Sequence, residues 1–305
     1  MKAALIGYGY WGKIIERYIV AHGIELTYIY CRTFIENDKW VDSQDIIWKD
    51  KTVSLVFVCT PVRTHFDICK AALLAGKHVF CEKPTVKSMR ELCELQSCAE
   101  QAGRILYTDY IYTVSPSIRY IKENIGRIGQ LEAVNADIGQ YGMFYAEDDV
   151  YEVLGVHLIS AIYYIAGVHT GTCNYSYDFS AELPLSGKIE YNLENGGKVH
   201  INCSLIANEK VRRMQLIGER GSICFSMNTK PNVVIRLWEK EGNSVKTIHT
   251  MEKNFDEAHG LSYAIEEFVS AVEQKDCRNN RMTAWEVQSV LEERTTVKQI
   301  KITEC

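Results

Sequence analysis

The sequence predicts an α/β protein with two parts: an N-terminal doubly wound parallel sheet and a C-terminal α+β part with a large, mainly antiparallel sheet. Up to about residue 109, strand-like and helix-like apolar patterns alternate, which is typical of a parallel sheet. From about residue 131, strand-like runs follow one another, which favours antiparallel pairing. With 305 residues, the chain is also longer than one typical domain.

The first half predicts its elements through apolar spacing. Phe66, Cys69, Ala72 and Leu73 recur at helical spacing, and Gly76 follows where a helix C′ residue is expected. We expect strands at 2–6, 25–30, 54–59, 78–81 and 104–108, and helices at 12–22, 63–76 and 87–102.

The second half opens with a helix at about 116–124, so we place a first domain at 1–115 and a second at 116–305. Gly196-Gly197 predicts a tight hairpin turn between two alternating runs. We expect strands at 131–138, 188–192, 198–205, 213–217, 222–225, 233–238 and 246–250, helices at 152–166, 257–274 and 282–296, and a late strand at 297–302.

Charge and hydropathy exclude several functional classes. The net charge is −5 and no Lys/Arg block forms a stripe, which argues against a nucleic-acid or anionic-membrane surface. The chain begins directly with a strand-like run instead of a signal peptide, and no apolar run approaches the roughly 20 residues of a membrane span. We expect a cytoplasmic protein.

The eleven cysteines show no C-x-x-C spacing, and five of them lie in apolar strand or helix patterns, so we expect buried free thiols at Cys59, Cys69, Cys93, Cys203 and Cys224. The histidines form no ligand-spaced cluster with the cysteines. The sequence therefore predicts no metal site.

A Gly-x-Gly-x-x-Gly segment formed by Gly7, Gly9 and Gly12 joins the first strand to the first helix. The first glycine permits a tight turn, the second lets the backbone approach a pyrophosphate, and the third allows close helix–strand packing. The N–H groups of the helix N-terminus face the anion. This pattern predicts dinucleotide binding by a Rossmann domain, and we include Tyr10 and Trp11 in the site.

The second strand indicates which nicotinamide cofactor is bound. It ends in Tyr30-Cys31-Arg32-Thr33 and carries no carboxylate where one would hold the adenosine ribose 2′-hydroxyl. Arg32 can instead meet a 2′-phosphate and stack on adenine, so NAD(P) binding with NADP favoured is expected. In the alternative, Arg32 is a solvated loop residue and the Cys31 backbone holds the ribose.

Several motifs together resemble the glucose–fructose oxidoreductase/inositol dehydrogenase/MocA (Gfo/Idh/MocA) family. They are the glycine fingerprint, Val56–Pro61 with His65, Ala75–Val79, and Cys81-Glu82-Lys83-Pro84. The segments 109–116 and 204–212 are similar to parts of members that act on nucleotide-linked or surface-polysaccharide sugars, although Leu205, Ala207 and Asn208 depart from the pattern. The resemblance implies that Thr60, Pro61, His65, Glu82 and Lys83 belong to the cofactor site.

Lys83 is the first candidate catalytic residue. At the carboxyl end of a parallel strand, it would hydrogen-bond the reacting oxygen and the nicotinamide ribose, and Pro84 would fix the turn. The family often holds this proline peptide in the cis form, and we expect the same here. The alternative is a surface lysine paired with Glu82.

His157 is the second candidate. The segment 152–160 resembles the family's Asp-x-Gly-x-His segment, whose histidine exchanges the proton of the substrate hydroxyl. The aligned carboxylate is Val153 here, and Glu152 is one position away, rotated by about 100° on a helix. A frame slip could bring Glu152 into use, or Asp109 could orient His157. The alternative is a core histidine in an inactive descendant.

Further candidates lie in the second half. Lys210 and Arg212 alternate on a predicted strand and would share a face, where they could meet a phosphate or carboxylate or simply line a solvated edge. Tyr141 and Tyr145 could stack on a sugar ring or support a dimer. We include Asp109, Glu152 and Lys210 in the predicted substrate site.

Together these observations predict an NAD(P)-dependent oxidoreductase that transfers a hydride between its cofactor and a secondary alcohol or ketone of a sugar, nucleotide sugar or polyol. The alternative is a catalytically silent NADP-binding regulator of the same fold, because Val153 and Leu158 replace acidic residues that are usual in the family. The open sheet face suggests a homodimer or homotetramer.

Overall fold

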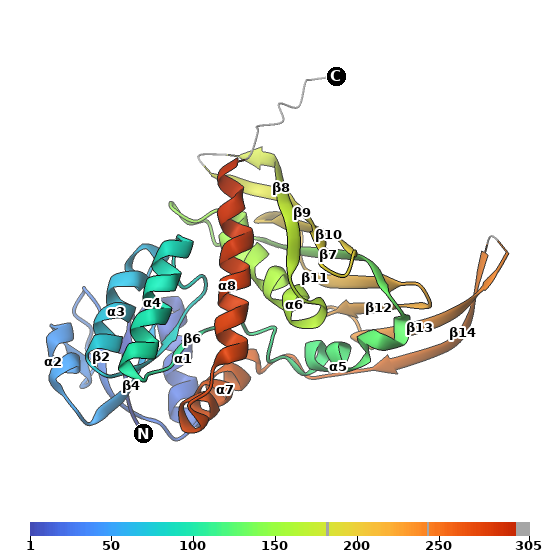
Figure 1. The fold of residues 1–305 in the computed structure, drawn as a ribbon. Coiled ribbons are helices and arrows are strands. Elements are labelled where there is room, and N and C mark those ends of the chain that lie inside the picture. The colour runs from blue at the N-terminus through green and yellow to red at the C-terminus, as the bar shows by residue number, and fades with distance from the viewer. Residues whose placement is uncertain (181–182, 243, 297–305) are drawn as a thin grey trace. The chain divides into compact units, whose positions relative to one another are not determined.

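The structure, a computed structural model, describes residues 1–180, 183–242 and 244–296. Contacts divide the chain into two compact units (Figure 1). The first contains Met1–Ile111 and His259–Gln288, and the second contains Tyr112–Ala258 and the residues from Ser289 onward. The chain therefore crosses between the units three times.

The first unit is the doubly wound parallel sheet that the sequence predicts. Its strands lie in the order β3-β2-β1-β4-β5-β6, all parallel. Its elements are β1 (Lys2–Ile6), α1 (Tyr10–Ala21), β2 (Glu25–Tyr30), β3 (Trp40–Val41), α2 (Gln44–Lys49), β4 (Val53–Val58), α3 (His65–Leu74), β5 (His78–Cys81), α4 (Met89–Ala102), β6 (Leu106–Thr108), α7 (Gly260–Gln274) and the part of α8 (Arg278–Glu292) up to Gln288. Strand β1 is central and buried because four of its five residues are apolar.

Two short elements, β3 and α2, were not predicted. Strand β3 has two residues and α2 has six, so neither is long enough to show an apolar period. Ser43 caps α2 by accepting a hydrogen bond from the backbone N–H of Asp45. That cap is the local signal that the sequence offered.

Helix α7 clusters with the first unit because Phe268 packs against aromatic side chains of the parallel sheet. Its ring lies 5.7 Å from Phe57, 5.6 Å from Phe80 and 5.8 Å from Tyr107. The amide of Asn280 on α8 accepts a hydrogen bond from the N–H of Thr108 and donates one to its carbonyl, each at 2.8 Å. These contacts cover edge strand β6, whereas the expected boundary placed both helices in the second domain.

The second unit contains an eight-stranded sheet in the order β14-β13-β12-β11-β7-β10-β9-β8. Among the described strand pairs of this second sheet, only β7–β10 is parallel, so the prediction of a mainly antiparallel sheet is confirmed. Its elements are α5 (Pro116–Asn124), β7 (Leu131–Tyr141), α6 (Val156–Ala166), β8 (His169–Ser180), β9 (Pro184–Leu193), β10 (Lys198–Ser204), β11 (Ile206–Gly218), β12 (Gly221–Ser226), β13 (Val233–Glu241) and β14 (Ser244–Lys253).

The turn between β9 and β10 is the predicted hairpin. Gly196 has φ +90°, and the N–H of Leu193 donates to the carbonyl of Gly197 at 2.8 Å. Strand β8 was not predicted, because its residues are largely polar and its register against β9 shifts three times. The expected strand at 297–302 lies outside the described residues.

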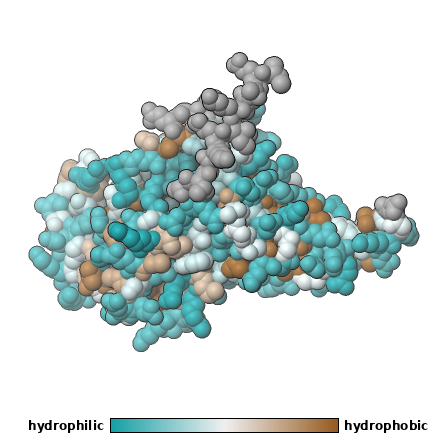
Figure 2. Space-filling model, turned by 45° about the horizontal axis from the view of Figure 1, so that its top comes forward, coloured by the Kyte–Doolittle hydropathy of each residue, from teal (hydrophilic) through white to brown (hydrophobic). Residues whose placement is uncertain are grey.

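The two faces of the second sheet differ in polarity. Alternate residues of β9 and β10, such as Ile189 and Val199, are buried, while those between them are exposed and polar. On the exposed face, Arg213 pairs with Asp137 at 2.8 Å. The view in Figure 2 likewise shows a mostly hydrophilic surface with hydrophobic residues scattered over it.

The ten cysteines of the described residues are all free thiols. Cys69 and Cys203 are buried as expected, Cys59 and Cys224 are partly buried, and Cys93 is exposed. Burial at Cys93 was therefore a wrong expectation, since it lies on the outer face of α4. Among the described helices, none is both long and apolar enough to cross a membrane.

Candidate functional site

The glycine turn after β1 leaves no room for side chains at two of its three glycines. Gly7 has φ +96°, and a Cβ there would lie 2.5 Å from the carbonyl oxygen of Cys59. A Cβ on Gly12 would lie 2.3 Å from the carbonyl oxygen of Gly7. A Cβ on Gly9 would have no heavy atom within 4 Å, so this position faces open space. Because Gly9 has no side chain and faces open space, a ligand can approach its backbone closely.

The N-terminus of α1 begins at this open position. Gly9 is its N-cap and offers no side-chain cap, and the first turn carries no acidic residue. The positive end of the helix dipole is therefore not neutralised within α1, which suits an anion. Tyr10 and Trp11 occupy the first turn with exposed side chains whose rings meet edge to face at 5.5 Å. The residues present thus fit a dinucleotide pyrophosphate.

Arg32 lies just beyond the carboxyl end of β2, next to this turn. The N–H of Gly7 donates to the carbonyl of Tyr30 at 2.8 Å, which ties the glycine turn to the end of β2, and Arg32 is exposed. Tyr8 was not singled out by the sequence. Its hydroxyl donates to Glu16, and this hydrogen bond, with burial, raises the pKa of Tyr8 to about 12.

A second group lies where β4, β5 and β6 end. Cys59 follows β4, Glu82 and Lys83 follow β5, and Asp109 follows β6. The N–H of Glu82 donates to Val58 at 3.0 Å and that of Asp109 to Cys81 at 2.9 Å, so each residue extends the ladder beyond its strand. We call Cys59, Glu82, Lys83 and Asp109 the strand-end cluster. Ligands of doubly wound sheets bind at this edge.

The strand-end cluster sets one buried carboxyl group, Asp109, and one partly buried carboxyl group, Glu82, beside one lysine. Burial raises the pKa of Glu82, although the charge of Lys83 opposes the rise. Burial and the nearby Glu82 raise the pKa of Asp109 well above its usual value, again against Lys83. Asp109 is 4% exposed, and among the described residues its Oδ1 has no hydrogen-bond partner. An orphaned buried oxygen beside a lysine is an unused site for a polar ligand group.

His65 joins the two loops that carry these residues. Its Nδ1 lies 3.1 Å from the carbonyl oxygen of Pro84, and its Nε2 lies 2.7 Å from that of Thr60. The ring is fully buried, so it is placed to hold the backbone of Thr60 and Pro84 rather than to touch a ligand directly. The Lys83–Pro84 peptide is cis, which confirms that expectation.

His157 stands in the second unit at the start of α6, after a π-helical turn at Tyr151–Gly155. Its ring lies 5.5 Å from that of Tyr112, and Ser160 donates a hydrogen bond to its carbonyl. Gly155 permits this placement, because a Cβ there would lie 3.2 Å from Ile189 of the sheet. The π-turn is the frame slip that the sequence left open.

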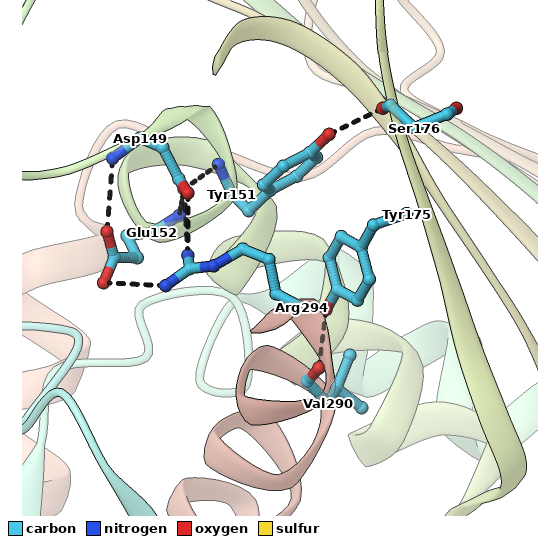
Figure 3. A network of polar contacts seen from close by, with 7 residues as sticks. All are labelled: Asp149, Tyr151, Glu152, Tyr175, Ser176, Val290 and Arg294. Carbon is cyan, nitrogen blue, oxygen red and sulfur yellow. Dashed lines mark hydrogen bonds and ion pairs between the residues drawn. The ribbon is translucent and has the colours of Figure 1, made fainter. Parts of the chain in front are cut away.

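After this π-helical turn, the carboxylate of Glu152 is engaged by Arg294 and by the backbone of Asp149. Glu152 is 4% exposed, and its Oε1 lies 3.4 Å from the guanidinium of Arg294, while its Oε2 accepts a hydrogen bond from the N–H of Asp149 (Figure 3). Asp149 also pairs with Arg294, at 2.9 Å. Val153, which takes the place of the family's carboxylate, is buried.

Lys210 and Arg212 do not share a face as expected. The register of β11 against β7 shifts between Ile206 and Val211, so Lys210 lies in an unpaired, exposed stretch. Arg212 is 8% exposed and donates to the carbonyl of Gly139 and to the side chain of Gln140.

Tyr112 joins Arg212 and His157, which the sequence did not anticipate. Burial raises the pKa of Tyr112 to about 12, although the charge of Arg212 opposes the rise. Tyr141 and Tyr145 are exposed, at 76% and 43%. The ring of Tyr141 meets that of Phe144 edge to face at 5.8 Å.

A cavity of about 560 Å³ lies elsewhere in the first unit, lined by α4, β6 and the start of α8. Arg104, Lys275, Arg278 and Arg281 are among its lining residues. None of the predicted site residues lines it, so it is separate from the strand-end cluster.

The N-terminal part of the chain matches a known family. Residues 1–110 match the model described as oxidoreductase family, NAD-binding Rossmann fold. An uncharacterised oxidoreductase, YdgJ of Escherichia coli, is 35% identical over 115 residues, which are 35% of this chain and 33% of that protein. The chain aligns with about a third or less of the length of the first curated relatives it matches.

Solved structures cover both units. UDP-N-acetylglucosamine 3-dehydrogenase GnnA from Acidithiobacillus ferrooxidans is similar with a TM-score of 0.85 at 18% identity, over 97% of each chain. A 3-ketoreductase from Actinomadura kijaniata, solved with TDP-benzene and NADP, gives 0.81 at 16% identity over 98% of each chain. At such identities the likeness establishes the fold. Residues 1–110 therefore match the Gfo/Idh/MocA oxidoreductase family, and the chain has the fold of these structural neighbours.

Proposed function

We propose that the protein is an NAD(P)-dependent oxidoreductase that interconverts a secondary alcohol and a ketone on a sugar, nucleotide sugar or polyol. The strand-end cluster carries this proposal, because it sets a lysine, the buried carboxyl group of Asp109 and the partly buried one of Glu82 at the sheet edge that also holds the glycine turn. The family match of residues 1–110 supports the cofactor class.

The glycine turn and the N-terminus of α1 would hold the pyrophosphate, with Gly9 giving backbone access. Thr60, Pro61 and Glu82 lie on loops at the same strand ends. The bound nicotinamide supplies the hydride acceptor or donor.

Lys83 would donate a hydrogen bond to the reacting oxygen and stabilise negative charge that develops there during the reaction. The carboxyl group of Asp109, whose pKa burial raises, would position a neighbouring substrate hydroxyl through its Oδ1, which has no hydrogen-bond partner among the described residues. We assign proton exchange with the reacting hydroxyl to His157, since an imidazole titrates near neutral pH. Glu152 would support the helix that carries His157 through its ion pair with Arg294.

NADP is the favoured cofactor. Arg32 is exposed beside the glycine turn, where it can meet a 2′-phosphate. The 3-ketoreductase from Actinomadura kijaniata was solved with NADP, which agrees with this choice.

The substrate class is proposed from the similar proteins. GnnA acts on UDP-N-acetylglucosamine by its name, and a relative that is 26% identical over 140 residues is a D-glucoside 3-dehydrogenase. Lys210 and the exposed Tyr141 and Tyr145 are candidate contacts for the sugar or its nucleotide. The assignment of a cofactor role to 1–115 and a substrate role to 116–305 is part of this proposal.

Two further features complete it. We place the protein in the cytoplasm, where free thiols persist, and we expect no nucleic-acid partner because the net charge is −5. A homodimer or homotetramer through the open face of the second sheet would be polar, since Arg213, Asp137, His200 and Glu190 form ion pairs there.

The experiment is a fluorescence titration of the purified protein with NADPH and NADH, followed by absorbance assays with a panel of nucleotide sugars and polyols. Tight binding of NADPH with turnover on one panel member is the expected result. Binding without turnover on a broad panel would favour the silent regulator, and no binding of either nucleotide would contradict the cofactor assignment.

A further inference from the structure

A cluster outside the proposed site brings together three different metal-ligating side chains in the second unit. His169 and Cys173 lie on β8, and Glu293 begins the 3₁₀ turn Glu293–Thr296 after α8. One ligand atom from each residue lies within 4.8 Å of the other two. Cys173 is 6% exposed, and the side chains of His169 and Glu293 are 9% and 32% exposed, so the cluster reaches solvent mainly at Glu293.

An irregularity of β8 produces this cluster. In a regular strand, residues four positions apart are separated by about 13 Å along the strand. Here the register of β8 against β9 shifts between Thr170 and Asn174, and Gly171 between the two ligands has φ +71°. The bulge brings His169 and Cys173 together, which the sequence spacing does not reveal. The expectation that histidines and cysteines form no cluster is therefore wrong at this position.

The separation of His169 and Glu293 fits a shared ion better than a direct hydrogen bond. His169 Nε2 and Glu293 Oε1 lie 3.5 Å apart, which is long for a hydrogen bond. Two ligand atoms on a tetrahedral zinc ion, each about 2.0–2.1 Å from the metal, would be roughly 3.3 Å apart. The observed separation is close to that value.

The other oxygen of Glu293 is already fixed, since Oε2 accepts a hydrogen bond from the N–H of Cys173. Such a contact orients a ligating carboxylate, and the second oxygen of Glu293 lies toward His169. The neighbouring Arg294 is held by Asp149, and Tyr175 donates to the carbonyl of Val290, so the chain on both sides of Glu293 is anchored (Figure 3).

We propose that His169, Cys173 and Glu293 bind a divalent transition-metal ion of the zinc class. One nitrogen, one thiolate sulfur and one carboxylate oxygen suit zinc, while magnesium and calcium prefer oxygen ligands alone. Binding releases the thiol proton of Cys173 to solvent, and the fourth position of the ion is left for water. The ion would join β8 to the segment after α8.

The test is a titration of the reduced, chelator-treated full chain with Co²⁺, which reports a bound thiolate through a near-ultraviolet charge-transfer band. One equivalent of Co²⁺ should produce this band, and Zn²⁺ should displace it. Cys173→Ser should abolish the band, and His169→Ala should weaken Co²⁺ binding about 10–100-fold. Cys224→Ser, which changes a partly buried cysteine of β12, is the matched control and should behave like the unchanged protein.

A thermal melt with and without Zn²⁺ guards against variants that misfold. The unchanged protein and Cys224→Ser should gain melting temperature with Zn²⁺, whereas Cys173→Ser should melt at the same temperature with or without it. A charge-transfer band that persists in Cys173→Ser would overturn the site. So would the absence of any band and of any Zn²⁺-dependent stabilisation in the unchanged protein.

Discussion

The Nδ1 of buried His65 lies 3.1 Å from the carbonyl oxygen of Pro84, the residue that follows Lys83. On the other side of the ring, Nε2 lies 2.7 Å from the carbonyl oxygen of Thr60. One imidazole thus joins the loop after β4 to the loop after β5, and through that second loop it fixes the backbone of Lys83. In the proposed reaction, His65 is a positioning residue.

Replacing His65 with Phe should keep the core filled but remove both hydrogen bonds. Because Lys83 would lose its fixed backbone, we expect kcat to fall about 10-fold or more, with a smaller change in the KM for NADPH. His65→Asn, which keeps one hydrogen-bonding arm, should recover part of the rate. Steady-state kinetics of both variants measure the split, and equal kcat values in all three proteins would contradict the positioning role.

Asp109→Asn should raise the free energy of unfolding at neutral pH. The pKa of Asp109 is raised in the folded protein by burial and by Glu82, so the folded state binds a proton that the unfolded chain releases above about pH 4. Stability is therefore lost as the pH rises from the unfolded pKa toward the folded one, and an asparagine escapes that loss.

Urea unfolding of Asp109→Asn and of the unchanged protein between about pH 4 and pH 8 measures this gain in the free energy of unfolding. The gain should shrink toward about pH 4. Asp276→Asn is the control of opposite sign, since hydrogen bonds from Arg278 lower the pKa of the partly exposed Asp276. The compared quantity is the free energy of unfolding of Asp109→Asn minus that of the unchanged protein. If this difference falls as the pH rises from acidic to neutral, the burial argument is refuted.

Arg32→Ala should weaken NADPH binding about 10-fold or more and leave NADH binding nearly unchanged, because only NADPH carries the 2′-phosphate. Fluorescence titrations with both nucleotides give the two Kd values. Arg63→Ala, another exposed arginine in the first unit, serves as the control. Equal losses for both nucleotides would show that Arg32 does not read the phosphate.

Arg294→Met should destabilise the second unit by about 3–5 kcal/mol, because it leaves the buried carboxylates of Asp149 and Glu152 without their cation. Arg213→Met breaks the more exposed pair with Asp137 on the open sheet face and should cost less than about 1 kcal/mol. Urea unfolding compares the two variants. A similar small cost for both would show that the buried network contributes little.

The sequence predicted the parallel sheet well, because its strands are continuous apolar runs and its helices have clear apolar faces. Strand β1 and helix α5 begin and end at the predicted residues. It missed β3 and α2, because two and six residues are too few for an apolar pattern to repeat several times. It also missed β8, where bulges disturb the alternation of side chains.

The site was predicted in part. The glycine turn and the placement of Lys83 at a strand end follow from local sequence order, which is why they could be foreseen. The partner of Glu152 could not, since Arg294 is more than a hundred residues away and only tertiary packing brings them together. The same holds for Asp109 beside Glu82 and for Tyr112 beside His157.

The most direct test of the account is the Lys83→Met variant, compared with the unchanged protein in NADPH binding and in turnover of the panel substrate. We expect nearly equal Kd values for NADPH, and a rate at least roughly 100-fold lower in the variant, because the lysine acts on the reacting oxygen. Unchanged turnover in Lys83→Met would contradict the central claim that the strand-end cluster performs the chemistry.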